Sequence, residues 1–179
     1  MPVQAMLPAV LVDLINGWGS VPRAEAGEQA APYPPHADLI GRLALPEHVG
    51  AGMTDAELQR VADLLHPIFA ATHIGERAIR TTDLLTRSGL RPALLAEGSS
   101  IRSNWLVEDP ETAVLAAAAS ALYGQLTGSD PNRLGTCTGD RCADAYIDAS
   151  PAGHRRFCSI TCQNRARVAA FRRRRAAST

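Results

Sequence analysis

The four cysteines of the chain lie in two close pairs near its end, and this arrangement restricts the fold more than any other feature. Cys137 and Cys142 form the first pair, and Cys158 and Cys162 form the second pair after an interval of fifteen residues. Structural zinc ions are bound by four ligands at the corners of a tetrahedron, and thiolates are among the ligands they prefer. Two short-spaced pairs supply such ligands from two turns. The spacing therefore predicts one structural Zn²⁺ per chain, bound by all four thiolates.

The residues around the cysteines predict a small zinc-binding module. Residues 139–140 allow a tight knuckle between the first two cysteines. Residues 146–148 and 155–157 are expected as two short strands joined by a turn. Ser159 is expected to cap a helix, so that Cys158 and Cys162 lie on one face of its first turn. Knuckle, hairpin and helix in this order describe a treble-clef-like zinc finger.

Two other interpretations of the cysteines are possible. The pairs could form structural disulfides, but the start of the chain shows no secretory signal, and cytoplasmic thiols stay reduced. His154 could replace one thiolate as a ligand, although it lies in the expected hairpin turn.

No apolar run is long enough to cross a membrane, so we expect a cytoplasmic protein without a membrane partner.

The second cysteine pair resembles the CGNR zinc finger family. The match consists of Phe157-Cys158-Ser159 followed by Cys162-Gln163-Asn164-Arg165. Two departures are present: Gln163 stands where the family has glycine, and this cysteine pair encloses three residues where family members often have four. The opening segment, 6–16, resembles the start of the ABATE domain that precedes this finger in many bacterial proteins. The combined resemblance implies a bacterial transcription regulator of the stress-induced type, with at most a ligand-sensing role for the first domain.

The charge distribution separates the chain into two parts. Every basic residue is arginine, and residues 133–179 contain ten arginines against three aspartates. Residues 1–132 contain eight arginines against fifteen acidic residues, so the net charge of zero conceals a basic end and an acidic remainder. Such an asymmetry favours an anionic partner for the basic end.

The first domain, residues 1–130, is expected to be rich in α-helix and to sense a ligand or dimerise. A capping box at Thr54 starts a helix, and Asp109-Pro110 starts another that runs to Thr127. Residues 17–37 are expected as a loop, and Pro67 as a kink or a helix start. The other expected elements are a buried segment or helix at 6–16, a short helix at 39–45, helical residues 68–87, and a hairpin of 90–96 with 101–107. The fold class is therefore mainly α, with a small α+β component.

Candidate catalytic groups are few, and we do not expect an enzyme. No nucleophile elbow, P-loop or dinucleotide fingerprint occurs in the sequence. His48, His66 and His73 are isolated, and the last two are too far apart for an ordinary metal pair. Histidines that are exposed or hydrogen-bonded within the fold are expected instead.

The second domain, residues 131–179, ends in an arginine-rich helix that predicts binding to double-stranded DNA. One side of this helix, with Ile160, Asn164, Val168 and Phe171, is expected to pack on the hairpin or the first domain. Guanidinium groups elsewhere on it could reach phosphates or guanine edges. The alternative is a protein-interaction or redox-sensing zinc module, and a homodimer is possible in either case. The candidate DNA-binding residues are Arg155, Arg156, Asn164, Arg165, Arg167, Arg172, Arg173, Arg174 and Arg175.

Overall fold

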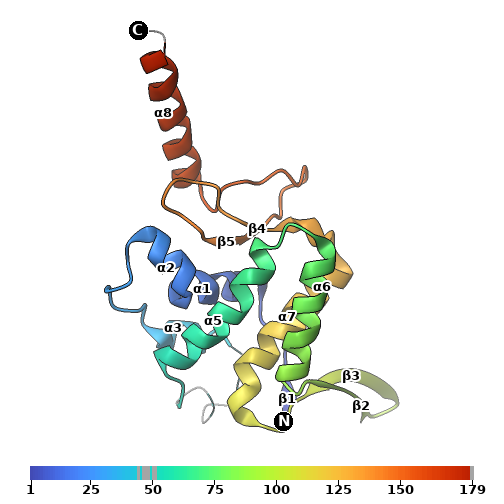
Figure 1. The fold of residues 1–179 in the computed structure, drawn as a ribbon. Helices are drawn as coiled ribbons and strands as arrows, with labels where there is room; N and C mark the ends of the chain where they lie inside the picture. The colour runs from blue at the N-terminus through green and yellow to red at the C-terminus, as the bar shows by residue number, and fades with distance from the viewer. Residues whose placement is uncertain (44, 46–48, 50–51, 178–179) are drawn as a thin grey trace.

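The computed structural model describes residues 1–43, 45, 49 and 52–177 of the chain. Helices predominate, and two small sheets accompany them, which confirms the predicted mainly α class (Figure 1). No helix in these ranges is long and apolar enough to cross a bilayer. His48, one of the isolated histidines, lies outside the described residues, as does residue 44 of the short helix expected at 39–45.

Four helices form the body of the molecule, and their apolar faces make its core. They are α1 (Pro8–Trp18), α5 (Asp55–Ala70), α6 (Ile74–Arg87) and α7 (Ala113–Gly128). Alanine is common on the buried face of α7, and such small side chains let neighbouring helices approach closely. The largest fully buried side chains include Leu14 of α1 and Phe69 of α5.

The helix starts follow the predicted capping signals. The Thr54 hydroxyl accepts a hydrogen bond from the Glu57 N–H, and the Glu57 carboxylate accepts one from the Thr54 N–H at 2.7 Å. This reciprocal pair satisfies two N–H groups that the helix leaves without partners. Asp109 caps a 3₁₀ turn, η1 (Pro110–Thr112), which leads into α7. The helix α5 continues through Pro67 to Ala70, so of the two predictions for Pro67 the start of a new helix is wrong.

The predicted hairpin is confirmed. Strands β2 (Arg91–Glu97) and β3 (Ser100–Leu106) pair in antiparallel register, with Glu97 opposite Ser100. Gly98 in the turn has a φ of 61°, a conformation that glycine adopts without steric cost. The short strand β1 (Pro2–Val3) pairs with the other edge of β3.

Two predictions for residues 17–45 are wrong. Residues within the expected loop form α2 (Ser20–Ala26), and the short helix is α3 (His36–Ile40) rather than 39–45. The helix α2 is stable here because tertiary contacts replace the absent side-chain cap. The Ser20 N–H donates to the Asp63 carboxylate at 2.7 Å, and the buried Arg23 side chain donates to carbonyl groups that include Glu28 at 2.8 Å.

The zinc-finger segment lies on the body and ends in a helix that projects from it. It contains η2 (Pro131–Arg133), β4 (Leu134–Thr136), β5 (Ala145–Ile147) and α8 (Ile160–Ala177). Figure 1 shows β4 and β5 between the helical body and α8, which extends away from both. The strands β4 and β5 of this segment therefore pack on the body, whereas α8 projects from it.

Side chains of the body form hydrogen bonds with the backbone of β5 and of the loop before it. The Asn16 side chain of α1 donates to the Ala145 carbonyl at 3.1 Å and accepts from the Ala145 N–H at 2.7 Å. His66 Nε2 of α5 lies 2.8 Å from the Ala143 carbonyl oxygen. Leu134 and Ala145, at 2% and 0% exposed, belong to the core cluster of the body. One hydrophobic core thus crosses the domain boundary expected at residue 130, and that boundary stays a prediction.

Arg77 of α6 provides a third connection. It is 6% exposed, and its guanidinium donates to the carbonyl groups of Ala71 and Leu134, each at 2.8 Å, and to that of Pro131. A buried guanidinium is costly unless its N–H groups are paired. In Arg77 both Nη groups have carbonyl partners, which lie on both sides of the expected boundary, whereas the buried Nε has no partner among the described residues.

Replacing Arg77 by alanine should therefore destabilise the whole protein. We expect Arg77→Ala to lower the free energy of unfolding by about 3 kcal/mol, because buried carbonyl groups lose their donors. Arg80→Ala on the same helix is the control, since its ion pair with Glu76 is exposed and should contribute less than about 1 kcal/mol. Urea unfolding of the zinc-loaded protein measures both. Equal stability of the two variants would show that Arg77 does not join the two parts.

Candidate metal centre and basic helix

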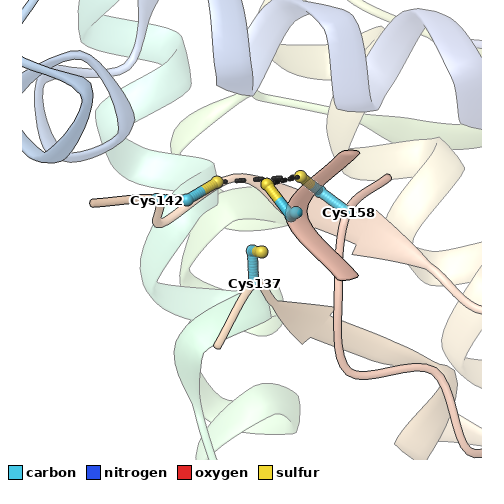
Figure 2. Close-up of side chains that lie close together, drawn as sticks. Cys137, Cys142 and Cys158 are labelled. Carbon is cyan, nitrogen blue, oxygen red and sulfur yellow. Dashed lines mark hydrogen bonds between the residues drawn. The ribbon is translucent and has the colours of Figure 1, made fainter. Parts of the chain in front are cut away.

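The fold brings all four cysteines to one point. Cys137 follows β4, Cys142 lies in the loop before β5, Cys158 precedes α8, and Cys162 is in the first turn of α8. Their sulfur atoms all lie within 4.8 Å of one another, and the close-up shows the side chains converging (Figure 2). Residues separated in sequence by the strand β5 thus form one compact group.

The sulfur positions fit a tetrahedral zinc site. Cys142 Sγ lies 3.6 Å from Cys158 Sγ, and Cys158 Sγ lies 3.5 Å from Cys162 Sγ. Zinc–sulfur bonds of about 2.3 Å at tetrahedral angles place sulfur atoms about 3.8 Å apart. A disulfide bond would need about 2.05 Å, and the four cysteines are free thiols in this structure. Four sulfur ligands leave no coordination position for water, so the site is suited to a structural ion.

Local backbone structure sets the position of each cysteine pair. The Gly139 N–H donates to Cys137 Sγ at 3.4 Å, and a Cβ on Gly139 would lie 3.3 Å from that sulfur atom. Glycine therefore permits the knuckle to close around Cys137. The Ser159 hydroxyl accepts from the Cys162 N–H at 3.2 Å, which confirms Ser159 as the cap of α8.

The thiols differ in their tendency to ionise. Burial raises the pKa of Cys142 to about 12, and burial also raises the pKa of Cys158. Burial acts in the same direction on Cys162, but hydrogen bonds from Arg165, Cys158 and Ser159 outweigh it and lower the pKa of Cys162 to about 7. At neutral pH the metal-free centre thus holds protons that a zinc ion must displace.

The predicted hairpin of the finger is wrong in its second strand. The strand β5 pairs with β4, and residues 155–157 form no strand. The cause is Asp148, a buried residue that the sequence analysis did not single out. Its carboxylate accepts from the Ser150 N–H at 2.9 Å and the Arg155 N–H at 2.8 Å. A hydrogen bond from the Ser150 side chain, followed by the one from the Arg155 N–H, lowers the pKa of Asp148 to about 2. An aspartate two residues before a Ser-Pro turn is the sequence signal for this loop.

The candidate DNA-binding residues fall into two groups. Arg155 and Arg156 lie in the loop before α8, where the Arg155 side chain donates to the Phe157 carbonyl at 2.8 Å and lies 5.1 Å from the centre of the Tyr146 ring. The backbone carbonyl of Arg156 accepts from the Thr138 N–H at 3.0 Å. Arg155 therefore contributes to the finger's own structure. The other candidates are exposed residues of α8, namely Asn164, Arg165, Arg167, Arg172, Arg173, Arg174 and Arg175.

The prediction that one side of α8 packs against the protein is wrong. Ile160 is 75% exposed, Val168 49% and Phe171 56%. The reason is that the metal centre holds the first turn of the helix, and β4 and β5 lie between this turn and the body. The rest of α8 therefore extends away from the body (Figure 1).

Among the described histidines, none belongs to the group of side chains placed to hold a metal ion. His66 is buried against the Ala143 carbonyl and His73 is exposed before α6, so they are not a metal pair. Among the described residues, the group of side chains placed to hold a metal ion consists of the four cysteines and does not include His154.

Comparison with known families places a zinc-binding module in this part of the chain. The family described as CGNR zinc finger matches residues 133–175. No curated protein matches the chain. The matched segment contains all four cysteines, and together the match and the sulfur geometry support one structural zinc ion per chain.

Zinc affinity should depend steeply on pH. Because Cys142 and Cys158 have raised pKa values, each must release a proton at neutral pH, and the zinc association constant should fall at least about 100-fold for each pH unit below neutrality. Competition against a chelator of known pH dependence between pH 6 and 8 measures this slope. Cys158→Ser should bind zinc more weakly and release one proton fewer. An association constant that does not change with pH would show that the thiolates form before the metal binds.

Proposed function

We propose that the protein is a DNA-binding transcription regulator, in which zinc fixes the base of α8 and the helix enters a groove of double-stranded DNA. The observation that carries the proposal is the exposed, arginine-rich helix that projects from the body (Figure 1). The zinc finger at the base of this helix supports the same function, as does the net positive charge of residues 133–179, which contrasts with the net negative charge of the rest of the chain.

The distribution of arginines around α8 suits the major groove. Arg172 lies on one face of the helix, whereas Arg167 and Arg174, which are seven residues apart, share the opposite face. A helix about 10–12 Å wide fills a major groove that is about 12 Å across, so phosphates flank it on both sides. Arginines on opposite faces can then contact both strands. The arginine run 172–175 surrounds the helix, which favours binding to phosphates over recognition of particular bases.

The helical body would act as the regulatory part. A cleft of about 790 Å³ lies between α1–α3 and the finger, with Trp18, Arg42 and Arg141 among its lining residues. Ligand sites are concave and often lie between two parts of a protein, so the position of this cleft supports a ligand-sensing role. We propose a binding protein rather than an enzyme, acting in the bacterial cytoplasm with an ABATE-like first domain.

A second candidate function follows from the apolar side chains of α8. Val168 and Phe171 are about half exposed on a helix that also carries the arginines. Exposed apolar groups of this kind favour contact with another protein, which could be a second copy of this chain or a different partner. DNA binding and protein binding therefore predict different effects of neutralising the arginines.

The test is a salt titration with purified, zinc-loaded protein. Genomic fragments selected by the protein provide the preferred duplex, and a random duplex serves for comparison. Changing Arg172, Arg173, Arg174 and Arg175 to glutamine should weaken binding to both duplexes. The slope of log affinity against log salt should become shallower by about 0.9 for each phosphate that the variant no longer neutralises.

The matched control removes the same charge elsewhere. Glutamine at Arg60, Arg80, Arg87 and Arg91 changes four exposed arginines of the first domain and should leave DNA affinity nearly unchanged. If the α8 variant binds both duplexes as the wild type does, α8 is not the DNA-binding surface. The protein-interaction function would then be favoured.

A further inference from the structure

The Arg165 side chain turns back toward the metal centre. Arg165 lies three residues after Cys162, so both side chains lie on the same face of α8. Its Nη2 atom donates a hydrogen bond to Cys162 Sγ at 3.0 Å. The same residue lines the cleft between the finger and the helices α1–α3, together with Asp13 and Asp144. The guanidinium therefore lies beside the sulfur ligands rather than along the outer part of the helix.

A zinc ion with four thiolates carries a net charge of −2, and groups that donate to sulfur offset this charge. The Cys142 thiol has a backbone hydrogen bond with Asp144, and two further sulfur atoms accept hydrogen bonds from N–H groups. Cys137 Sγ accepts from the backbone of Gly139 at 3.4 Å, and Cys162 Sγ accepts from Arg165. The bond from Arg165 is the shorter of the two and comes from a charged donor.

We propose that Arg165 is a positioning residue of the zinc centre, whose guanidinium holds the Cys162 thiolate in place and slows loss of the metal. The hydrogen bond withdraws electron density from the sulfur atom, so the thiolate is less readily protonated or alkylated while it ligates zinc. This role differs from the contact to a phosphate or a base that the sequence predicts for Arg165. The proposal rests on the zinc centre and does not require DNA binding.

Three variants separate the charge, the geometry and the position of the side chain. Arg165→Ala removes the donor, and Arg165→Lys retains a cation without the planar fork of the guanidinium. Arg167→Ala removes an exposed arginine from the same helix. Because hydrogen-bond partners of metal ligands contribute about 10–100-fold to metal affinity, Arg165→Ala should weaken zinc binding by a factor in this range. Arg165→Lys should recover part of the loss, and Arg167→Ala should match the wild type.

The measurements are chelator competition with Zn²⁺ and the rate of cysteine alkylation in the zinc-loaded full-length protein. Arg165→Ala should lose zinc to the chelator more readily than Arg167→Ala and should be alkylated faster. The proposal is overturned if Arg165→Ala and Arg167→Ala bind zinc equally and are alkylated at equal rates. A decrease in affinity for the preferred duplex in Arg165→Ala alone, with unchanged zinc affinity, would instead assign Arg165 to DNA contact. The zinc affinity and the alkylation rate test the proposal for Arg165 whether or not the protein binds DNA.

Discussion

The convergence of four sulfur atoms within 4.8 Å is the constraint on which the arrangement of the finger depends. Two of these atoms come from the loop between β4 and β5, which packs on the body, and two come from the start of α8, which projects from it. A metal ion bound by both pairs joins the projecting helix to the strands. The direction of α8, and any function of its arginines, therefore depends on the metal.

The strands are in turn held by the body. Asn16 pairs with both backbone groups of Ala145, and Arg77 donates to the Leu134 carbonyl from within the protein. These contacts, with the burial of Leu134 and Ala145, join β4 and β5 to the core of the body. The cleft beside Arg141 and Arg165 is lined by residues of both the finger and the helices α1–α3.

Local signals in the sequence predict the metal ligands and most helices, because cysteine spacing and capping residues act over a few positions. The capping box at Thr54 and the cap at Ser159 are examples. The partner of β5 could not be predicted, because the Asp148 carboxylate bends the following residues away from a hairpin. The exposure of Phe171 was missed for a related reason: an apolar spacing identifies a face but not whether another element covers it.

Hydrogen exchange of the full-length protein with and without zinc tests the central claim most directly. If zinc fixes the first turn of α8 against the strands, removing it should abolish amide protection in residues 158–165. Amides of β4 and β5 should keep much of their protection, since Asn16 and Arg77 still hold them. Unchanged protection of α8 without zinc, or loss of protection throughout β4 and β5, would contradict this account.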